Sequence, residues 1–228
     1  DMYNVAIGHD AGNTMTTGTQ NTLIGGLSGD ALTVGNQNVA IGTHALTADT
    51  KGSGSVAIGR SALEAQNFSS ATTVDNVAVG RHAGLSVTTG VNNVLVGGLA
   101  GDAITTGDHN IAIGKDALHA NTQANKSVAI GSSALYSQNI TSDSDADNVA
   151  IGFNAGYAVT TGIQNTLIGK GAGDALTDAD FNVAIGTDAL TADTQGSRSI
   201  AIGRRALHAQ NFTSATDTYN TAVGFEAG

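Results

Sequence analysis

The sequence predicts an all-β protein, a parallel β-solenoid of about 13 coils, and three observations support this fold class. A short motif ending in glycine recurs thirteen times, it delimits three 17-residue units and one 21-residue unit in a repeating order, and its centre is β-branched. Repetition at a fixed period is the signature of stacked units that share one continuous core. β-branched residues favour strands, and a unit of this length is too short for a pair of helices. We therefore expect each coil to contain a strand, a turn, a short second strand and another turn.

Four units build a 72-residue super-repeat, which predicts a single continuous solenoid domain over residues 1–228. The super-repeats span 4–75, 76–147 and 148–219, and a partial one spans 220–228. Asp1–Gly12 aligns with Asp217–Gly228 at an offset of three super-repeats, and neither segment resembles a distinctive cap. Because a bare terminal coil exposes strand edges, we expect the chain to be a fragment of a longer fibre whose period continues in phase.

The motif strand places its residues alternately on two faces. Its second and fourth residues are bulky in nearly all copies, so they are predicted to fill the interior. The predicted solenoid core comprises Val5, Ile7, Ile24, Val39, Ile41, Ile58, Val79, Val96, Ile113, Ile130, Ile151, Ile168, Ile185 and Ile202. The third residue is Ala or Leu, and it is predicted to face outward, where a neighbouring chain can pack closely. The candidates for this face are Ala6, Leu23, Ala40, Leu95 and Leu167.

The first motif residue is Asn in ten copies and Ser in three. Stacked at the same point of successive coils, these side chains can form a hydrogen-bonded ladder that satisfies turn backbone and fixes the register. The predicted turn ladder comprises Asn4, Asn21, Asn38, Ser55, Asn76, Asn93, Asn110 and Ser127. The glycines of the "TTG" turns, Gly18, Gly90 and Gly162, are expected to adopt a positive φ.

The 21-residue units lengthen one linker in each super-repeat. Equivalent positions in these linkers hold Phe68, Ile140 and Phe212 in a chain with few aromatic residues. Loops on solenoids are common binding faces, so these residues are weak binding-loop candidates. The alternative, which Ile140 favours, is an apolar plug tucked against the coil.

The composition excludes several classes of function. Nine basic and nineteen acidic residues give a formal charge of −10, the wrong sign for binding nucleic acid or an anionic membrane. No apolar run is long enough to span a bilayer, so we expect no membrane insertion in this segment. Cysteine is absent and the six histidines are scattered, so no catalytic residue, metal site or cofactor is predicted. Asp30, Asp102 and Asp174 recur once in each super-repeat and are expected in turns, with an ion on a trimer axis as the alternative.

The motifs "NVAIGxxAG" and "SVAIGRSAL", with "TTGxxN" between them, resemble two groups of fibrous proteins over essentially the whole chain. One is the head repeat of trimeric autotransporter adhesins, and the other is the repeat array of bacteriophage tail fibres. The resemblance implies a left-handed β-roll and a side-by-side homotrimer with two identical chains. The regular alternation of short and long units is more similar to the phage arrays.

The resulting expectation is a non-enzymatic structural and adhesive shaft segment of a trimeric extracellular fibre. A phage tail fibre on a virion, supporting host attachment through a cell-surface receptor or glycan, is favoured. The alternative is the head of a bacterial cell-surface adhesin that binds host or surface ligands. An ice-binding solenoid would need a flat Thr-x-Thr array, and a polysaccharide-cleaving solenoid would need an acidic cluster. The sequence shows neither pattern.

Overall fold

The computed structural model describes residues 2–228 as strands and turns without a helix, which confirms the all-β parallel solenoid. Asp1, with which the expected end-to-end alignment begins, lies outside the described residues. The chain forms two compact units that divide between Asn110 and Ile111, with six coils in the first and seven in the second. The prediction of one continuous domain over 1–228 stays a prediction.

Each coil carries one three-residue strand, and within each unit these strands form a parallel ladder. In residues 2–110 the ladder order is β1 (Val5–Ile7), β2 (Thr22–Ile24), β3 (Val39–Ile41), β5 (Val56–Ile58), β7 (Val77–Val79) and β8 (Val94–Val96). In residues 111–228 it is β9 (Ile111–Ile113), β11 (Val128–Ile130), β13 (Val149–Ile151), β14 (Thr166–Ile168), β15 (Val183–Ile185), β17 (Ile200–Ile202) and β19 (Thr221–Val223). The register follows the repeat, so that Ala6 is paired with Leu23 and Leu23 with Ala40. Every expected motif strand is therefore present.

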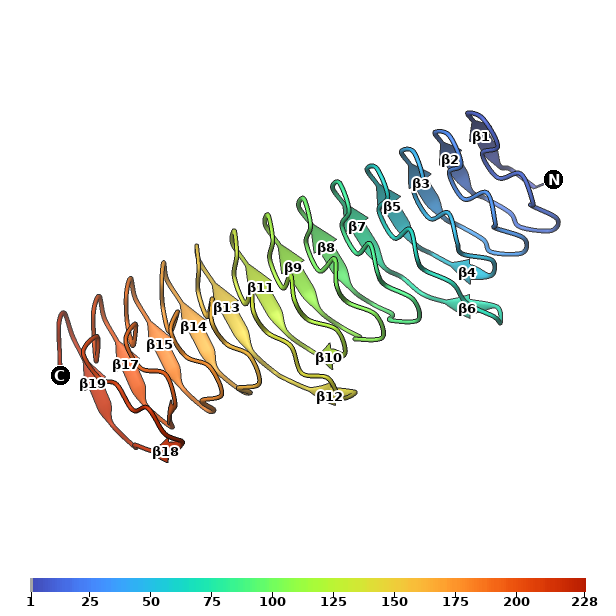
Figure 1. Ribbon diagram of the computed structural model, residues 1–228. Coiled ribbons are helices and arrows are strands. Elements are labelled where there is room, and N and C mark those ends of the chain that lie inside the picture. Colours follow the sequence, from blue (N-terminus) through green and yellow to red (C-terminus); the bar gives the residue numbers. More distant parts are fainter. Residues whose placement is uncertain (1) are drawn as a thin grey trace. The chain divides into compact units, whose positions relative to one another are not determined.

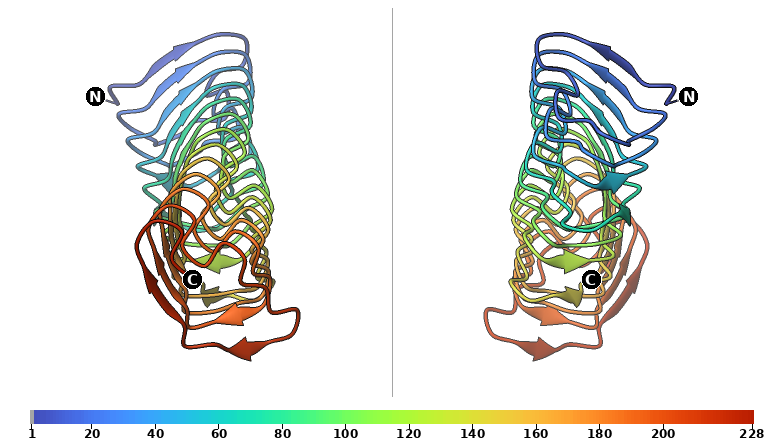
Figure 2. Two further views of the ribbon diagram at one scale, coloured as in Figure 1. Left: turned by 90° about the vertical axis from the view of Figure 1, so that its left-hand side faces the viewer. Right: turned by 90° about the vertical axis from the view of Figure 1, so that its right-hand side faces the viewer.

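The predicted second strand is present only beside the long linkers. It forms three two-residue pairs: β4 (Gly52–Ser53) with β6 (Thr72–Thr73), β10 (Ala124–Asn125) with β12 (Ser144–Asp145), and β16 (Gly196–Ser197) with β18 (Thr216–Asp217). Elsewhere the chain turns without a second strand, as Figure 1 shows for the successive coils of each unit. The views of Figure 2 show that each coil closes into a narrow loop with its strand along one side.

The glycine that ends each motif strand is required by both conformation and space. Gly42 has a φ of 137°, and a Cβ built on it would overlap the backbone of Gly59 in the next coil. An L-residue rarely adopts this conformation. Gly18, Gly90 and Gly162 behave differently from the prediction, since none has a positive φ. A side chain on Gly18 would instead meet the carbonyl oxygen of Gly35, so the close approach of the next coil selects glycine there.

The two faces of the motif strand are the reverse of those predicted. In β2, β3 and β5 the third motif residue is fully buried, whereas its two neighbours are only half-buried. The wrongly assigned core residues Val5, Ile7, Ile24, Val39, Ile41, Ile58, Val79, Val96, Ile113, Ile130, Ile151, Ile168, Ile185 and Ile202 are half-buried or exposed in the chain. The interior is too narrow for bulky residues at every position, because each coil also sends turn residues such as Ala45 and Leu46 inward.

Inward leucines and glycines alternate so that the interior volume stays filled. Leu95 replaces the usual inward Ala, and both of the turn positions it reaches are glycine. A Cβ on Gly84 would lie 2.7 Å from Leu95 Cδ1, and one on Gly101 would lie 2.8 Å from Leu95 Cδ2. Where the strand residue is Ala, as at Ala57, the same turn position of its own coil can hold a buried leucine, Leu63. The narrow interior therefore accepts one large side chain at either place.

Candidate functional site

The most extended candidate for interaction is the outer sheet face, which we define as the second and fourth residues of the motif strands in each unit. In residues 2–110 it consists of Val5, Ile7, Thr22, Ile24, Val39, Ile41, Val56, Ile58, Val77, Val79, Val94 and Val96. In residues 111–228 it consists of Ile111, Ile113, Val128, Ile130, Val149, Ile151, Thr166, Ile168, Val183, Ile185, Ile200, Ile202, Thr221 and Val223. These positions hold only Val, Ile and three Thr, and most are half-buried. Extended apolar surfaces of this kind mark sites of protein association.

The residues predicted to face a partner chain point the other way. Leu23, Ala40, Leu95 and Leu167 are fully buried inside their own coils. Ala6 is exposed along with the rest of β1, yet its register with Leu23 gives it the same inward direction. A small third residue is therefore explained by the packing within one chain, and the partner-facing assignment of all five residues is wrong.

The predicted Asn ladder is confirmed, and it lies inside the coil. The backbone N–H of Asn38 donates to Asn21 Oδ1 at 2.9 Å, while the Asn38 side-chain amide donates to the carbonyl of Gly52, also at 2.9 Å. Ser55 continues the ladder, since its N–H donates to Asn38 Oδ1 at 2.9 Å. The same contacts link Asn4 to Asn21, Asn76 to Asn93 and Asn93 to Asn110 in the first unit. Each amide oxygen thus accepts from the backbone of the next coil, while the amide nitrogen donates to a turn carbonyl of its own coil.

Serine is too short to continue the ladder with its side chain, and a glutamine from the long linker takes over. Gln66 Nε2 donates to Ser55 Oγ at 3.0 Å, and Gln66 Oε1 accepts from Asn76 Nδ2 at 3.0 Å. Gln138 and Gln210 make the same bridges in the second unit, from Ser127 to Asn148 and from Ser199 to Asn220. These glutamines were not predicted from the sequence, although each follows its serine by eleven positions. Each long unit thus begins with a serine and supplies the glutamine that replaces the missing amide.

Asp49 is a fully buried carboxylate that the sequence analysis also missed. Its Oδ1 accepts from the N–H groups of Gly52 at 2.9 Å and Phe68 at 3.3 Å, and its Oδ2 accepts from Gln66 Nε2 at 2.6 Å. Asp193 has the corresponding partners in the second unit. Buried carboxylates need this degree of compensation. Because their donors come from the protein itself, Asp49 and Asp193 hold the linker in place and are not free for catalysis.

A column of exposed or half-buried threonines forms another ladder between coils. Thr16 Oγ1 donates to the carbonyl of Thr33 at 3.0 Å, and Thr33 Oγ1 donates to that of Thr50 at 2.9 Å. Thr88 and Thr177 repeat this contact with the coils that follow them. The hydroxyl of each of these threonines is directed at the neighbouring coil. This arrangement differs from the paired, outward Thr-x-Thr array of the ice-binding alternative.

The long-linker residues differ in exposure. Phe68 is 7% exposed and packs against the coil, as the plug interpretation predicts. Ile140 and Phe212 are half-buried. The carbonyl oxygens of Phe68 and Phe212 also accept hydrogen bonds from Thr50 Oγ1 and Thr194 Oγ1, at 2.9 and 2.8 Å. These contacts tie the base of the linker to the preceding coil at Phe68 and Phe212. A role of the three residues in binding stays a prediction.

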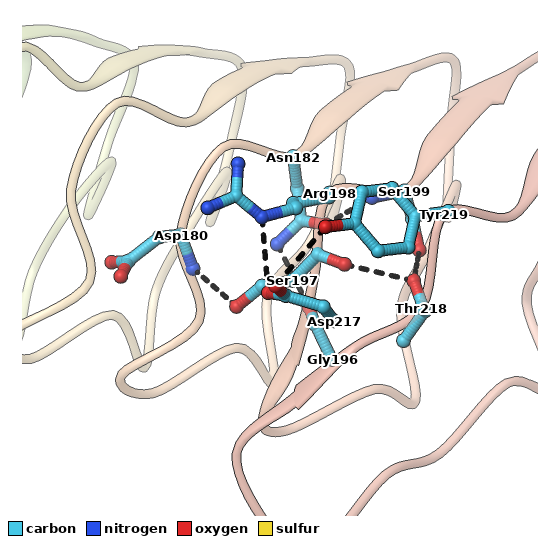
Figure 3. A network of polar contacts seen from close by, with 9 residues as sticks. All are labelled: Asp180, Asn182, Gly196, Ser197, Arg198, Ser199, Asp217, Thr218 and Tyr219. Atoms are coloured by element: carbon cyan, nitrogen blue, oxygen red, sulfur yellow. Dashed lines mark hydrogen bonds and ion pairs between the residues drawn. The ribbon is translucent and has the colours of Figure 1, made fainter.

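Exposed side chains gather over the last coils of the second unit. The Arg198 guanidinium lies 4.5 Å from the centre of the Phe181 ring and 6.0 Å from that of Tyr219. Figure 3 shows Arg198 Nε directed at Asp217 Oδ1, 3.0 Å away, with the Tyr219 hydroxyl donating to the same carboxylate at 3.2 Å. Below this layer, Thr218 Oγ1 donates to the Ser197 carbonyl at 2.9 Å. The charges in this cluster satisfy one another.

A second aromatic group in this unit is a stack of three rings from successive coils. The His119 and Tyr136 rings lie 4.8 Å apart, and the Tyr136 and Tyr157 rings 5.0 Å apart, all nearly parallel. Because each ring covers the face of its neighbour, stacking stabilises the coils in register.

The described residues 2–228 contain no cleft or cavity of ligand size, and no group of three or more His, Asp or Glu side chains close enough to hold a metal ion. Asp174, one of the three aspartates that recur in each super-repeat, accepts a hydrogen bond from Thr191 Oγ1 at 2.6 Å. Across the same residues the structure has no helix with the length and hydropathy of a membrane span.

Comparison of the chain with protein-family models found no match, and comparisons with curated proteins and with solved structures found none either.

Proposed function

We propose that the chain is a non-enzymatic shaft segment of an extracellular fibre, in which three identical chains lie side by side through their outer sheet faces. The observation that carries this proposal is the strip of Val and Ile on that face of each unit, which contains no charged residue. In a chain with 19 acidic and nine basic residues, such a strip is the surface best suited to burial against another copy.

The periodicity of the strip favours an identical partner. Its branched side chains recur once in every coil at the spacing of the parallel ladder, so a second copy presents the same ridges at the same intervals. The interior ladders and the coil-to-coil backbone bonds make each unit resistant to bending, which suits a shaft. This location of the interface replaces the third-residue face that the sequence suggested.

A bacteriophage tail fibre that supports attachment to a host surface is the favoured parent protein, because its repeat arrays resemble these alternating 17- and 21-residue units. The head of a bacterial trimeric autotransporter adhesin is the second candidate, supported by its similar Asn/Ser-led motif. Both place the chain outside the cell. Fluorescently labelled protein should bind bacterial envelopes in the first case, and animal-cell or matrix surfaces in the second.

The assembly is tested by sedimentation of the protein and of two variants. The unsubstituted chain should sediment at three times its mass of 22.6 kDa. Replacing Ile41 and Ile58 together by lysine should yield monomers, because four to six charges would face one another across the interface of a dimer or trimer. Thr43→Lys, an exposed position next to the end of β3, is the matched control and should remain trimeric. If the unsubstituted chain stays monomeric at micromolar concentration, the proposal is ruled out.

A further inference from the structure

Three nitrogen-rich side chains meet on the surface of the first unit. Arg60 follows β5 by two residues, Arg81 follows β7 by two, and His82 comes next. Arg60 Nη2 lies 2.6 Å from His82 Nε2, and Arg81 Nη1 lies 3.2 Å from His82 Nδ1. Both arginines are exposed and the histidine is half-buried. Two guanidinium groups therefore stand on either side of one imidazole ring.

The hydrogen bonding of this cluster cannot be completed from within. A guanidinium group only donates, and a neutral imidazole has one nitrogen that accepts and one that donates. One of the two arginines therefore directs its N–H at an N–H of His82. Among residues 2–228, neither arginine forms an ion pair with a carboxylate. Glu64 and Asp102 are the acidic groups that act on His82 electrostatically. The cluster therefore has one accepting nitrogen for two guanidinium groups, so its donors are in excess.

The second unit shows what such a cluster holds when an acceptor is present. Two super-repeats later, Arg204 stands where Arg60 does and Glu226 stands where His82 does. Glu226 Oε1 lies 3.1 Å from Arg205 Nη1 and 3.8 Å from Arg204 Nη1. A carboxylate thus stands beside the arginines of the second unit at the position that His82 occupies in the first.

We propose that Arg60, Arg81 and His82 form a binding site for an anionic ligand bearing a carboxylate, which supplies from outside the chain the negative charge that Glu226 supplies in the second unit. The carboxylate would accept charge-assisted hydrogen bonds from both guanidinium groups and from the imidazole N–H. An acidic sugar on a cell surface and a free organic acid share this chemistry. The site does not depend on the trimer or on the fibre function proposed above.

The binding is measured by NMR on the intact chain, following the imidazole signals of His82. Acetate, glucuronic acid and neutral glucose are added separately at millimolar concentrations, with sodium chloride at equal ionic strength as the salt control. Acetate and glucuronic acid should shift the His82 signals saturably and raise the pH at which His82 titrates, whereas glucose should not. Tighter binding of glucuronic acid than of acetate would assign the ligand to acidic sugars, and equal binding to simple carboxylates. No saturable shift beyond that of sodium chloride would overturn the proposal.

Three variants separate this site from general charge effects. Arg81→Gln should weaken acetate binding by about tenfold, because it removes one of the two charged donors. His82→Glu should abolish binding, since the new carboxylate would pair with Arg60 and Arg81 as Glu226 pairs with its arginines; for this variant the Arg81 side-chain signals are followed. Arg204→Gln removes an arginine whose carboxylate partner is already present and should leave binding unchanged. Equal weakening by Arg81→Gln and Arg204→Gln would contradict the assignment.

Discussion

Gln66 Nε2 donates to Ser55 Oγ at 3.0 Å, although the two residues lie eleven positions apart and in different parts of the coil. This bond closes the one gap in the asparagine ladder of the first unit. Its counterparts, Gln138 with Ser127 and Gln210 with Ser199, close the gaps in the second. In each super-repeat, the serine and the glutamine of the long linker thus act together to continue the ladder.

Replacing one of these bridging glutamines should destabilise the coil that contains it. Gln138→Leu removes the buried amide that bridges the side chains of Ser127 and Asn148, and we expect a loss of about 1–3 kcal/mol in the free energy of unfolding. Gln164→Leu, at an exposed position, is the control and should change stability little. Urea denaturation of the two variants provides the comparison, and equal midpoints would mean that the bridge contributes nothing.

The inward direction of the third motif residue predicts a strong asymmetry between neighbours in β8. Leu95→Ala should cost about 2–5 kcal/mol, since it leaves a cavity between Gly84 and Gly101. Val94→Thr should cost less than about 1 kcal/mol, because Thr22 and Thr166 already occupy this outward column. Chemical denaturation measures both. A larger loss for Val94→Thr would restore the original assignment of the faces.

The pairing of Asp193 with Gly196 predicts a compensating double substitution. A Cβ on Gly196 would overlap the Asp193 carboxylate, so Gly196→Ala should destabilise the second unit by about 1–3 kcal/mol. One super-repeat earlier, Asn121 stands with Ala124 and makes two hydrogen bonds to its backbone. The double variant Asp193→Asn with Gly196→Ala should therefore recover much of the loss. Thermal melting of the single and double variants tests the coupling, and simple additivity would refute it.

The pKa of His82 should depend on the neighbouring Arg81. Partial burial, followed by the charges of Arg60 and Arg81, lowers the pKa of His82 below its ordinary value of 6.5. The unfolded chain therefore takes up this proton more readily, so the stability contributed by neutral His82 is present above pH 6.5 and is lost as the pH falls through the lower folded pKa. Arg81→Gln should raise the pKa and reduce this loss. An NMR titration in which the variant keeps the parent midpoint would show that Arg81 has no such influence.

The sequence was sufficient for the strands, their parallel order and the asparagine ladder, because each depends on a repeated spacing. It was insufficient for the direction of the strand faces. Alternation shows that Ile41 and Ala40 point opposite ways, but not which of them is inside, and large apolar residues usually are. The decision depends on the width of the interior, which Leu46 and other turn residues already fill. The cluster of Arg60, Arg81 and His82 could not be predicted from the sequence, because Arg60 and His82 are 22 positions apart and meet only when the coils stack.

The bridge between Ser55 and Gln66 has a consequence for how such a chain can change length. Each serine needs a glutamine from its own long unit and an asparagine at the start of the next. Each inward leucine similarly needs glycines in two successive coils, as Leu95 does. Deleting or inserting a single coil would bring a serine, a leucine or a glycine against the wrong neighbour. A complete super-repeat preserves all of these pairings, so duplication or loss of whole super-repeats is the route by which the array can be lengthened or shortened without a fault in its interior.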